Sequence, residues 1–520
     1  MRMRAPRFLG LVLLSPLTAL SAPAETPNPA PEESRDEGAE TPQGSNAESA
    51  AKPEAELAPR ASLEEELGAL LQPGGLTSKR VAERTVDTSA RVEAKRRAEA
   101  SAAASASQVA QRFFPRLELS ARYTRLSEVT MPAFGTSEGV SQVFVQGESS
   151  TATPVGPSDQ LMKVTPPPFA FPVLLNNFEL KATLSVPLSD YLLRMSTAIG
   201  AANEALYGAE WNRKAEALLV QTDAKIAYYE WVKALGARYI AQKSVSQVQA
   251  ALRDVQQSFE IGTASKADVL RTEAQYNQAK LLLSRAERGV HVATEAIRTL
   301  QHDPPGAQYS VGENILEDVI VDAPATLEAA YQEAREKRLE LRALKAVERS
   351  YRKQAEAARK DNYPRLDAVG NAIYANPNQR IIPNLGTWDG TWDASLVLSW
   401  TPTAIPGVQS GARALDAKAA EYAAQRQAME DGLRMEVAQA LSALEEAQSA
   451  VITAREVLRA SEEGERVSRE LFRVGRATAL ELSDAQTNLT RARLELFFSH
   501  VEVRIARERL MHALGRDVTE

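Results

Sequence analysis

The sequence predicts a mainly helical protein with a small β part, in which long antiparallel coiled-coil hairpins join four membrane β-strands. Three observations lead to this prediction. Apolar residues repeat in heptads over long stretches without proline, four short segments alternate apolar and polar residues, and several motifs recur in the same order along the chain. Sustained heptads indicate packing of helix on helix, and strict alternation indicates strands with two unlike faces. The recurring motifs indicate an internal duplication.

The composition suits long helices and excludes several classes of function. Of the 520 residues, 44% are hydrophobic but only 6% are aromatic. The 61 basic and 68 acidic residues are spread along the chain, and the formal net charge is -7. No basic patch stands out, so nucleic acid is not an expected partner. The chain has no cysteine, which excludes disulfides, thiol catalysis and metal sites built on cysteine.

The N-terminus carries the pattern of an export signal. Residues 1–24 combine three arginines, a short apolar core (FLGLVLLSPLTAL) and a small-x-small cleavage site at Ala22-Pro23-Ala24. Residues 25–60 hold nine acids, three bases and six prolines, which predicts a disordered acidic leader. No later window offers the roughly 18 uninterrupted apolar residues of a membrane helix. We therefore expect an exported protein that no helix holds in a membrane.

Comparison of the chain with itself divides it into two repeats, residues 61–302 and 326–516, joined by a linker at 303–325. Four pairs of motifs recur in the same order: SLEEEL at 62–67 with TLEAAY at 326–331, FFPRLEL at 113–119 with NYPRLDA at 362–368, KATLSV at 181–186 with ASLVLSW at 394–400, and FEIGTA at 259–264 with FRVGRA at 472–477. The separations fall from 264 to 249 and then to about 213. A Pro-rich loop at 129–175 in the first repeat holds about 35 of the extra residues.

Each repeat contains two candidate strands, at 115–126 and 178–188 and at 365–374 and 392–401. Roughly ten residues with a period of two is the size of a membrane β-strand, although a small soluble sheet remains an alternative. Five aromatic residues lie near the strand ends, where interfacial girdles belong: Tyr123, Tyr374, Trp388, Trp392 and Trp400. About eight strands are needed to close a barrel, so a membrane barrel would need several copies of the chain.

The remaining regular structure is predicted to be helical. Residues 191–259 contain no proline and form an ascending helix roughly 100 Å long, and the returning helix at 264–301 is roughly 57 Å long. A further helix precedes each strand pair, at about 78–112 and 326–361. Gly262 and Gly475 interrupt the heptads at corresponding points, so we expect the chain to reverse there.

The search for catalytic patterns returned nothing that indicates an enzyme. The four histidines show no metal-ligand spacing, and the chain has no GxGxxG or GxxxxGK[ST] motif. Scattered Glu and Arg residues on helices are typical of solvated faces. We therefore expect no enzymatic activity, no cofactor and no metal.

These features together resemble the TolC-type outer-membrane efflux family, over about residues 61–516. The residues that carry the resemblance are the twin (F/Y)PRL(D/E) strand openings, the passages SVPLSDY at 185–191 and SWTPTAIPG at 399–407, and F-x-(I/V)-G at both turns. The resemblance implies a homotrimer whose strands form one twelve-stranded barrel in the outer membrane of a Gram-negative bacterium, above a trimeric α-barrel in the periplasm. It also implies a passive duct for small molecules or polypeptides that works with a periplasmic adaptor and an inner-membrane pump or ABC transporter. Cargo and resting state are not implied.

The resemblance also implies an entrance at the second hairpin. The family pattern VG-xxx-xx-D-xx-D falls here on Val474-Gly475, Glu481 and Asp484. In the family these two acids ring the periplasmic mouth and favour cations. The alternative is that both are ordinary solvated acids on a first helical turn.

A closed-state latch is expected next to this entrance. Asp268 matches a family acid that lines the entrance and pairs with an arginine on the neighbouring hairpin. The position of that arginine is occupied by Ala477, so Arg476 is the expected substitute, and the family tyrosine before the VG is Phe472. The expected residues for adaptor docking lie at the hairpin ends: Phe259, Gly262, Phe472, Val474 and Gly475.

A second class of function remains open from the residues alone. Long heptads also suit a periplasmic adaptor or a coiled-coil scaffold protein. An adaptor would carry one hairpin between lipoyl-like β-domains, and this chain instead repeats a plan of two strands and one hairpin.

Overall fold

The structure, a computed structural model, describes residue 68 and residues 71–129, 142–145, 161–164, 174–382 and 384–516. These residues belong to one compact unit, Ala61–Glu520. The expected signal peptide and acidic leader lie outside the described residues. None of the described helices combines the length and the apolar content needed to cross a membrane.

The described part of the first half begins with a short strand and two helices: β1 (Leu71–Leu76), α2 (Ser78–Thr88) and α3 (Ala90–Gln111). Four strands follow: β2 (Arg116–Arg125), β3 (Gln142–Val145), β4 (Leu161–Val164) and β5 (Asn176–Val186). The half ends with α4 (Leu188–Leu193) and the hairpin of α5 (Met195–Glu260) and α6 (Lys266–Gln301).

The second half begins with α7 (Leu327–Lys337), α8 (Leu339–Arg359) and the 3-10 turn η1 (Lys360–Asn362). The strands β6 (Arg365–Asn376) and β7 (Asp389–Ser399) come next. A second 3-10 turn, η2 (Pro402–Ala404), leads into the hairpin of α9 (Ile405–Arg473) and α10 (Ala479–Leu514). The fold class predicted from the sequence is therefore confirmed.

All four predicted membrane strands are present, and they form one antiparallel sheet in the order β2-β5-β6-β7. The two strands of each half are neighbours, and β5 and β6 join the halves. The strands β2 and β7 are the edges of this sheet. A separate two-stranded ladder of β3 and β4 lies in the predicted loop at 129–175, and neither it nor β1 was predicted.

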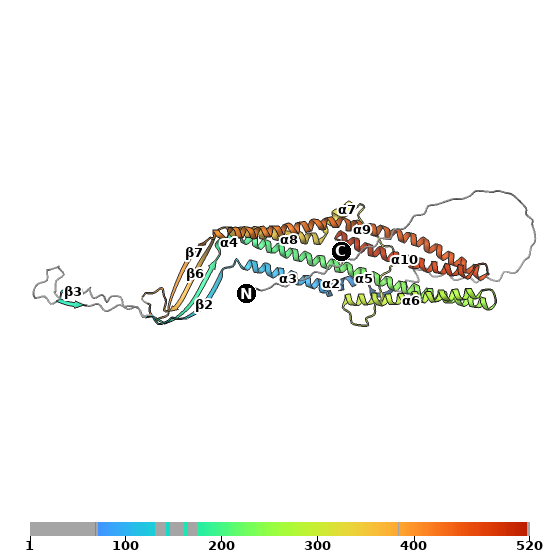
Figure 1. Ribbon diagram of the computed structural model, residues 1–520, viewed down its shortest axis with the longest axis horizontal. Helices are drawn as coiled ribbons and strands as arrows, with labels where there is room; N and C mark the ends of the chain where they lie inside the picture. Colours follow the sequence, from blue (N-terminus) through green and yellow to red (C-terminus); the bar gives the residue numbers. More distant parts are fainter. Residues whose placement is uncertain are drawn as a thin grey trace, which may run out of the picture. The chain divides into compact units, whose positions relative to one another are not determined.

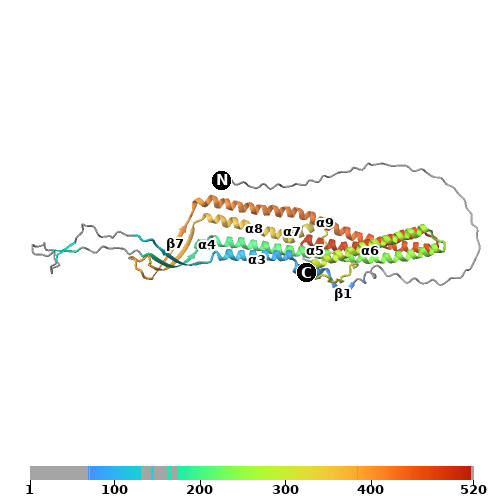
Figure 2. The same cartoon turned by 60° about the horizontal axis from the view of Figure 1, so that its bottom comes forward.

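The helices pack along one another beyond the sheet. The helix α5 packs against α3 on one side and α8 on the other, and α8 packs in turn against α9, as Figures 1 and 2 show. Toward the hairpin ends, α6 returns along α5, α10 returns along α9, and α10 also contacts α5. The main buried cluster lies where the hairpins meet, around Tyr228, Trp231 and Leu510. Because each of these helices buries only a narrow stripe against its neighbours, each also keeps an exposed face.

The two helices that precede the strands are each broken, although the sequence predicted them as continuous. The breaks fall at Ser89 and Arg338, both with extended ψ values, 121° and 122°. Arg338 is buried, and its guanidinium donates to the Glu436 carboxylate at 2.8 Å and to the carbonyl oxygen of His512 at 3.0 Å. These partners lie on α9 and α10, so no local pattern could reveal the break.

The repeat is more regular in the fold than in the motif comparison. The helices α2 and α7 each span 11 residues, and their capping residues, Thr77 and Thr326, stand 249 positions apart. Pro115 and Pro364 have the same separation. The structure therefore favours 77–82 as the counterpart of 326–331, and residues 62–67, which the motif comparison pairs with 326–331, lie outside the described residues.

The predicted ascending helix at 191–259 is also divided. The short helix α4 ends before Arg194, whose φ of -110° separates it from α5. At this break the side chain of Arg194 donates hydrogen bonds to Asp361 and Lys360 of η1 and to Tyr363, which precedes β6.

Candidate functional site

The two hairpin ends have the same backbone geometry. Gly262 and Gly475 have φ values of +83° and +71°, in the left-handed region that favours glycine. At the first end, the N–H of Gly262 donates to the carbonyl oxygen of Phe259 and that of Thr263 to Ser258. Gly475 and Arg476 repeat both hydrogen bonds at the second end. This pair of bonds is a Schellman motif, which ends a helix and reverses the chain.

A capping box begins each returning helix and involves two of the predicted entrance acids. The Asp268 carboxylate accepts from the backbone N–H of Ser265 at 3.0 Å, and the Ser265 hydroxyl accepts from the backbone N–H of Asp268. Glu481 and Thr478 form the same reciprocal pair at α10, where Thr478 N–H donates to the carboxylate at 2.7 Å. Asp268 and Glu481 are thus equivalent positions of the repeat, and both stabilise a helix start.

The electrostatics of the three acids differ. Hydrogen bonds from Ser265 hold the pKa of Asp268 below its usual range, and Arg271 adds an ion pair at 3.4 Å. Asp484 lies one turn above Glu481 and is exposed, and its carboxylate has no hydrogen bond or ion pair within the described chain. Of the predicted entrance acids, Asp484 is therefore the one whose charge is free of local partners.

The predicted latch residues are not brought together within one chain. Arg476 is exposed at the turn, and its side chain has no ion pair among the described residues. Asp268 is engaged with Ser265 and Arg271 instead. A latch between Asp268 and Arg476 would have to join different copies of the chain, and it stays a prediction.

The predicted docking residues divide into exposed and packed positions. Val474 and Phe259 are exposed on the turns, and the Nζ of Lys266 lies 5.7 Å from the Phe259 ring centroid. Phe472 instead packs on a small core that Val255, Val269 and Ala479 form. Ala479 comes from the second hairpin and the two valines from the first, so this core joins the two ends.

Two turns above this core, a polar contact that the sequence did not indicate joins the hairpins. The side-chain amide of Gln275 on α6 donates to the carbonyl oxygen of Ser483 on α10 at 2.9 Å and to the Thr487 hydroxyl at 3.2 Å. The Ser483 hydroxyl donates back to the Gln275 carbonyl oxygen at 2.6 Å. Ser483 stands between Glu481 and Asp484 in sequence, so this contact fixes the helical turn that carries the predicted entrance acids.

The register of the sheet sorts its residues onto two unlike faces. One face brings together Leu119 with Ala182, Ala372 and Trp392 across all four strands, and most of its large side chains are exposed. Leu119 and Trp392 are 75% and 80% exposed, although apolar residues of this size are usually buried. An apolar face of this extent needs an apolar environment.

The opposite face of the sheet is polar and internally bonded. Thr183 on β5 donates to the Asn371 side chain at 2.9 Å, which donates in turn to Asp393 on β7 at 2.9 Å. Arg380 completes the row with a bond to Asp393 at 2.6 Å. Alternation of apolar and polar faces is the pattern of a strand with lipid on one side and water on the other.

Four of the five predicted aromatic residues lie near the ends of the strands, whereas Trp392 lies within β7 opposite Ala372. At one end the rings of Tyr123, Phe178, Trp388 and Tyr374 form a chain of contacts, with centroids 5.0 to 6.0 Å apart. At the other end the indole N–H of Trp400 donates to the carbonyl oxygen of Asn362 at 3.0 Å. Such rings are typical of the two boundaries of a membrane.

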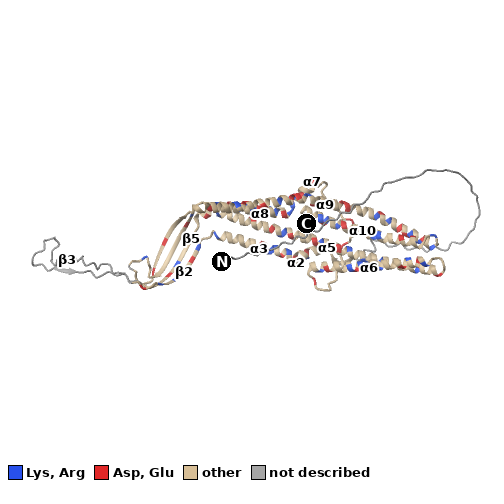
Figure 3. Cartoon of the chain, viewed as in Figure 1, with Lys and Arg blue, Asp and Glu red and all other residues tan. Residues whose placement is uncertain are grey.

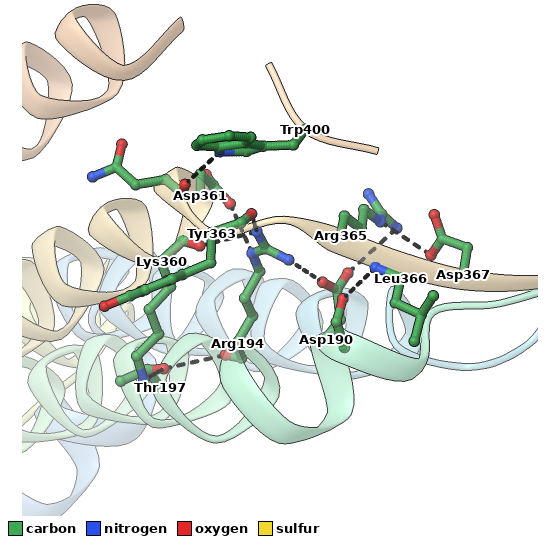
Figure 4. Close-up of polar contacts among 12 residues, drawn as sticks. Asp190, Arg194, Thr197, Lys360, Asp361, Tyr363, Arg365, Leu366, Asp367 and Trp400 are labelled. Atoms are coloured by element: carbon green, nitrogen blue, oxygen red, sulfur yellow. Dashed lines mark hydrogen bonds and ion pairs between the residues drawn. The ribbon is translucent and has the colours of Figure 1, made fainter. Parts of the chain in front are cut away.

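A partly buried arginine, Arg194, joins the sheet to the helices (Figure 4). Arg194 pairs with Asp190 on α4 and with Asp361 on η1, and it donates to the carbonyl oxygens of Lys360 and Tyr363 at 2.9 and 3.1 Å. Arg365, at the start of β6, adds a second contact to Asp190 at 3.3 Å. Because these residues come from both halves of the chain, the cluster fixes the passage from β5 to α4 against the passage from α8 to β6.

Within the described residues, no group of three or more His, Asp or Glu side chains is placed to hold a metal ion.

Comparisons with known proteins agree with this geometry. Residues 330–516 match the family described as "Outer membrane efflux protein", and the comparison with curated sequences gave no significant match.

Solved structures of similar fold include the outer-membrane channel OprN, with 15% identity and a TM-score of 0.65, over 86% of this chain and 94% of that one. The MtrE outer membrane channel of Neisseria gonorrhoeae shows 17% identity and a TM-score of 0.64, over 84% and 89%. The CmeC outer membrane channel of Campylobacter jejuni shows 13% identity and a TM-score of 0.65, over 92% and 95%. At these identities the likeness concerns the fold, and the match over residues 330–516 confirms the resemblance predicted from the sequence.

Proposed function

We propose that this chain, whose residues 330–516 match the outer membrane efflux protein family, is the passive exit duct of a tripartite efflux or type I secretion system. The observation that carries the proposal is the two-faced sheet, apolar on one side and polar on the other, which continues into very long helical hairpins. The family match does not favour the alternative of a periplasmic adaptor or scaffold.

The open edges of the sheet support a homo-oligomer. The strands β2 and β7 have no further strand partner within the described chain, and unpaired backbone groups are not tolerated in the hydrocarbon of a membrane. Pairing of β2 in one copy with β7 in the next satisfies both edges. Three copies with four strands each would close a barrel of twelve, consistent with the homotrimer that the family resemblance implies. The apolar face would then contact outer-membrane lipid, and the polar face would line the lumen.

The hairpins supply the reach of the duct. At about 1.5 Å per residue, the 66 residues of α5 and the 69 of α9 correspond to roughly 100 Å each. Each of the two proposed repeats, residues 61–302 and 326–516, provides one such hairpin. In a Gram-negative cell these hairpins would extend from the outer membrane into the periplasm and end at Gly262 and Gly475.

The hairpin ends are the proposed entrance. Threefold assembly would bring the carboxylates of Glu481, Asp484 and Asp268 around one axis, where their summed field selects by charge. Arg476 is the proposed partner of Asp268 on a neighbouring copy. The exposed apolar side chains of the turns are the proposed surface for a periplasmic adaptor, which would connect the duct to an inner-membrane pump or ABC transporter.

Membrane fractionation combined with unheated gel electrophoresis tests this proposal. We expect the mature protein in the outer-membrane fraction, migrating as a trimer without heating and as a monomer after it. Purified protein should form discrete conductance steps in planar lipid bilayers. A soluble monomer without conductance would contradict the proposal.

A further inference from the structure

A groove lies between α5, α7, α8 and α9, away from the hairpin ends and the sheet. Its volume is about 630 Å³, within the usual range of small-molecule sites. Tyr207 and Trp211 of α5 line one side, and Arg342 and Lys345 of α8 lie across from them. Aromatic rings and basic groups therefore face the same space.

The basic side of the groove is a regular feature of α8. Because α8 packs against α5 and α9, one narrow stripe of it remains exposed. With one exception, Glu356, the exposed residues of this stripe are basic: Arg342, Lys345, Arg349, Arg352 and Arg359. In Figure 3 the ribbon of α8 carries both basic (blue) and acidic (red) positions along its length. Three of these five pair with acids, Arg349 with Glu204, Arg352 with Glu348 and Arg359 with Asp416. The two at the groove, Arg342 and Lys345, are left to favour an anion.

Of the three acids that border the groove, Glu430 and Glu204 are already neutralised, whereas Glu336 is exposed and has no ion pair among the described residues. Glu430 lies at the floor with its side chain 8% exposed, and it pairs with both Arg335 and Arg426. Glu204 is also largely buried, and it pairs with Lys353 at 2.9 Å and with Arg349 at 3.9 Å. Neither carboxylate is left to balance the cations above it.

Two basic groups remain without an acidic partner. The Nζ of Lys345 forms no hydrogen bond or ion pair in the described part of the chain, and its side chain is exposed. Arg342 donates to the backbone carbonyl oxygen of Glu336 at 2.9 Å, and its guanidinium carbon lies 5.3 Å from the Trp211 ring centroid. The backbone bond and the ring contact orient this guanidinium without neutralising it. Tyr207, which is 51% exposed, offers an uncovered ring beside it.

We propose that this groove binds small aromatic anions. Arg342 and Lys345 hold the carboxylate or sulfonate of the ligand, and Tyr207 and Trp211 contact its ring. A ligand with both features matches the groove better than a simple anion, which would leave the exposed tyrosine unused. The inference goes beyond the proposed duct, because it concerns equilibrium binding to one chain and requires neither transport nor a partner.

Isothermal titration calorimetry on the full-length protein, purified in detergent, tests the inference with naphthalene-2-sulfonate as the probe. We expect saturable binding with one site per chain and no comparable binding of the neutral 2-naphthol. The double variant R342Q/K345Q should bind the sulfonate about tenfold more weakly, since two charge-assisted contacts are lost. The matched control is Arg359→Gln on the same stripe, because Arg359 pairs with Asp416 outside the groove.

The outcomes separate the site from weaker explanations. If 2-naphthol binds as tightly as naphthalene-2-sulfonate, apolar contact alone accounts for the binding. If Arg359→Gln weakens binding as much as R342Q/K345Q does, the overall charge of the protein accounts for it. Either result, or the absence of saturable binding, overturns the inference. If the double variant fails to assemble, Lys345→Gln alone serves, because this exposed side chain has no partner to lose. A negative result in this test does not contradict the proposed duct function, because that function is tested separately by conductance in planar bilayers.

Discussion

Gln275 and Ser483, which lie 208 positions apart in the chain, exchange two hydrogen bonds and join the two hairpins near their ends. Both side chains are uncharged, so this contact does not depend on salt in the way that an ion pair does. Ser483 belongs to the same first turns of α10 as the proposed entrance acids. The contact therefore holds the second hairpin, and the charges on it, against the first.

Replacement of Gln275 should loosen the entrance. The variant Gln275→Leu loses hydrogen bonds worth about 1 kcal/mol each, which shifts a closed-to-open equilibrium by about fivefold per bond. We expect a higher open probability in planar bilayers, with little dependence on salt. The control is Gln278→Leu, which lines the same small cavity and forms no hydrogen bond among the described residues. Equal gating in both variants would rule out a specific role for Gln275.

Substitution of the two proposed entrance acids of the second hairpin, Asp484 and Glu481, should have different effects on stability. Asp484→Asn removes an exposed charge without a partner, so cation preference in bilayers should fall about twofold while stability changes by less than about 0.5 kcal/mol. Glu481→Ala should lower the preference too, but it also removes a capping contact worth about 1 kcal/mol. Glu481→Gln keeps an acceptor for the Thr478 N–H and isolates the charge. Unchanged selectivity in Asp484→Asn would mean that this acid is an ordinary solvated residue.

Gly475 should be required for the stability of the turn only because of its positive φ, and not because a larger side chain would lack space. Apart from Gly475 and its two chain neighbours, no heavy atom lies within 4 Å of the position that a Cβ on Gly475 would occupy, yet its φ is +71°. Gly475→Ala should therefore cost about 1 kcal/mol of unfolding free energy. The matched control is Gly464→Ala in α9, which is also uncrowded but helical, and it should stabilise the helix by about 0.5 to 1 kcal/mol. Chemical denaturation of the detergent-purified protein measures both, and a neutral Gly475→Ala would contradict the argument from strain.

Loss of Arg194 should weaken the junction of sheet and helices. Arg194→Met leaves Asp190 buried with only the longer contact to Arg365, and we expect a loss of about 3 kcal/mol in unfolding free energy. The double variant D190N/R194M removes the stranded charge and should recover part of that loss. The stability of each variant is measured by the temperature to which a sample must be heated before its oligomer band disappears on a gel. If the double variant is less stable than the single one, the argument from an unpaired charge fails.

The protein should lose stability in mild acid because of His500. Burial lowers the pKa of His500 from 6.5 to about 4, with Arg504 and Arg455 nearby opposing its protonation and Asp318 favouring it. The folded protein therefore keeps this ring neutral while the unfolded chain takes up a proton below about pH 6.5. The stabilisation is complete above pH 6.5 and is lost, by about 3 kcal/mol, as the pH falls toward 4.

The variant His500→Gln should flatten this pH dependence in urea unfolding measured between pH 7 and 4. Substitution of the exposed His291 by Gln provides the control, because it removes a histidine without disturbing a buried position. An unchanged slope in His500→Gln would contradict the assignment.

Local patterns determined much of what this protein is. The alternation of apolar and polar residues placed all four strands of the sheet to within a few residues, because each strand carries its two faces in its own sequence. Heptads and the repeated glycine likewise located both hairpins and both turns. The same patterns, with the motifs that recur in each half, were sufficient to indicate the family.

Tertiary structure alone decided where those elements break and how they are joined. The helix breaks at Arg194 and Arg338 depend on carboxylates and carbonyl oxygens far away in sequence. The hydrogen bonds between Gln275 and Ser483 likewise join one hairpin to the other. From the sequence alone, a glutamine or arginine on a helix is predicted to be solvated, because its partner on another helix cannot be identified. Periodicity reports which face of an element is buried, but the identity of its neighbour is set by the packing of the whole chain.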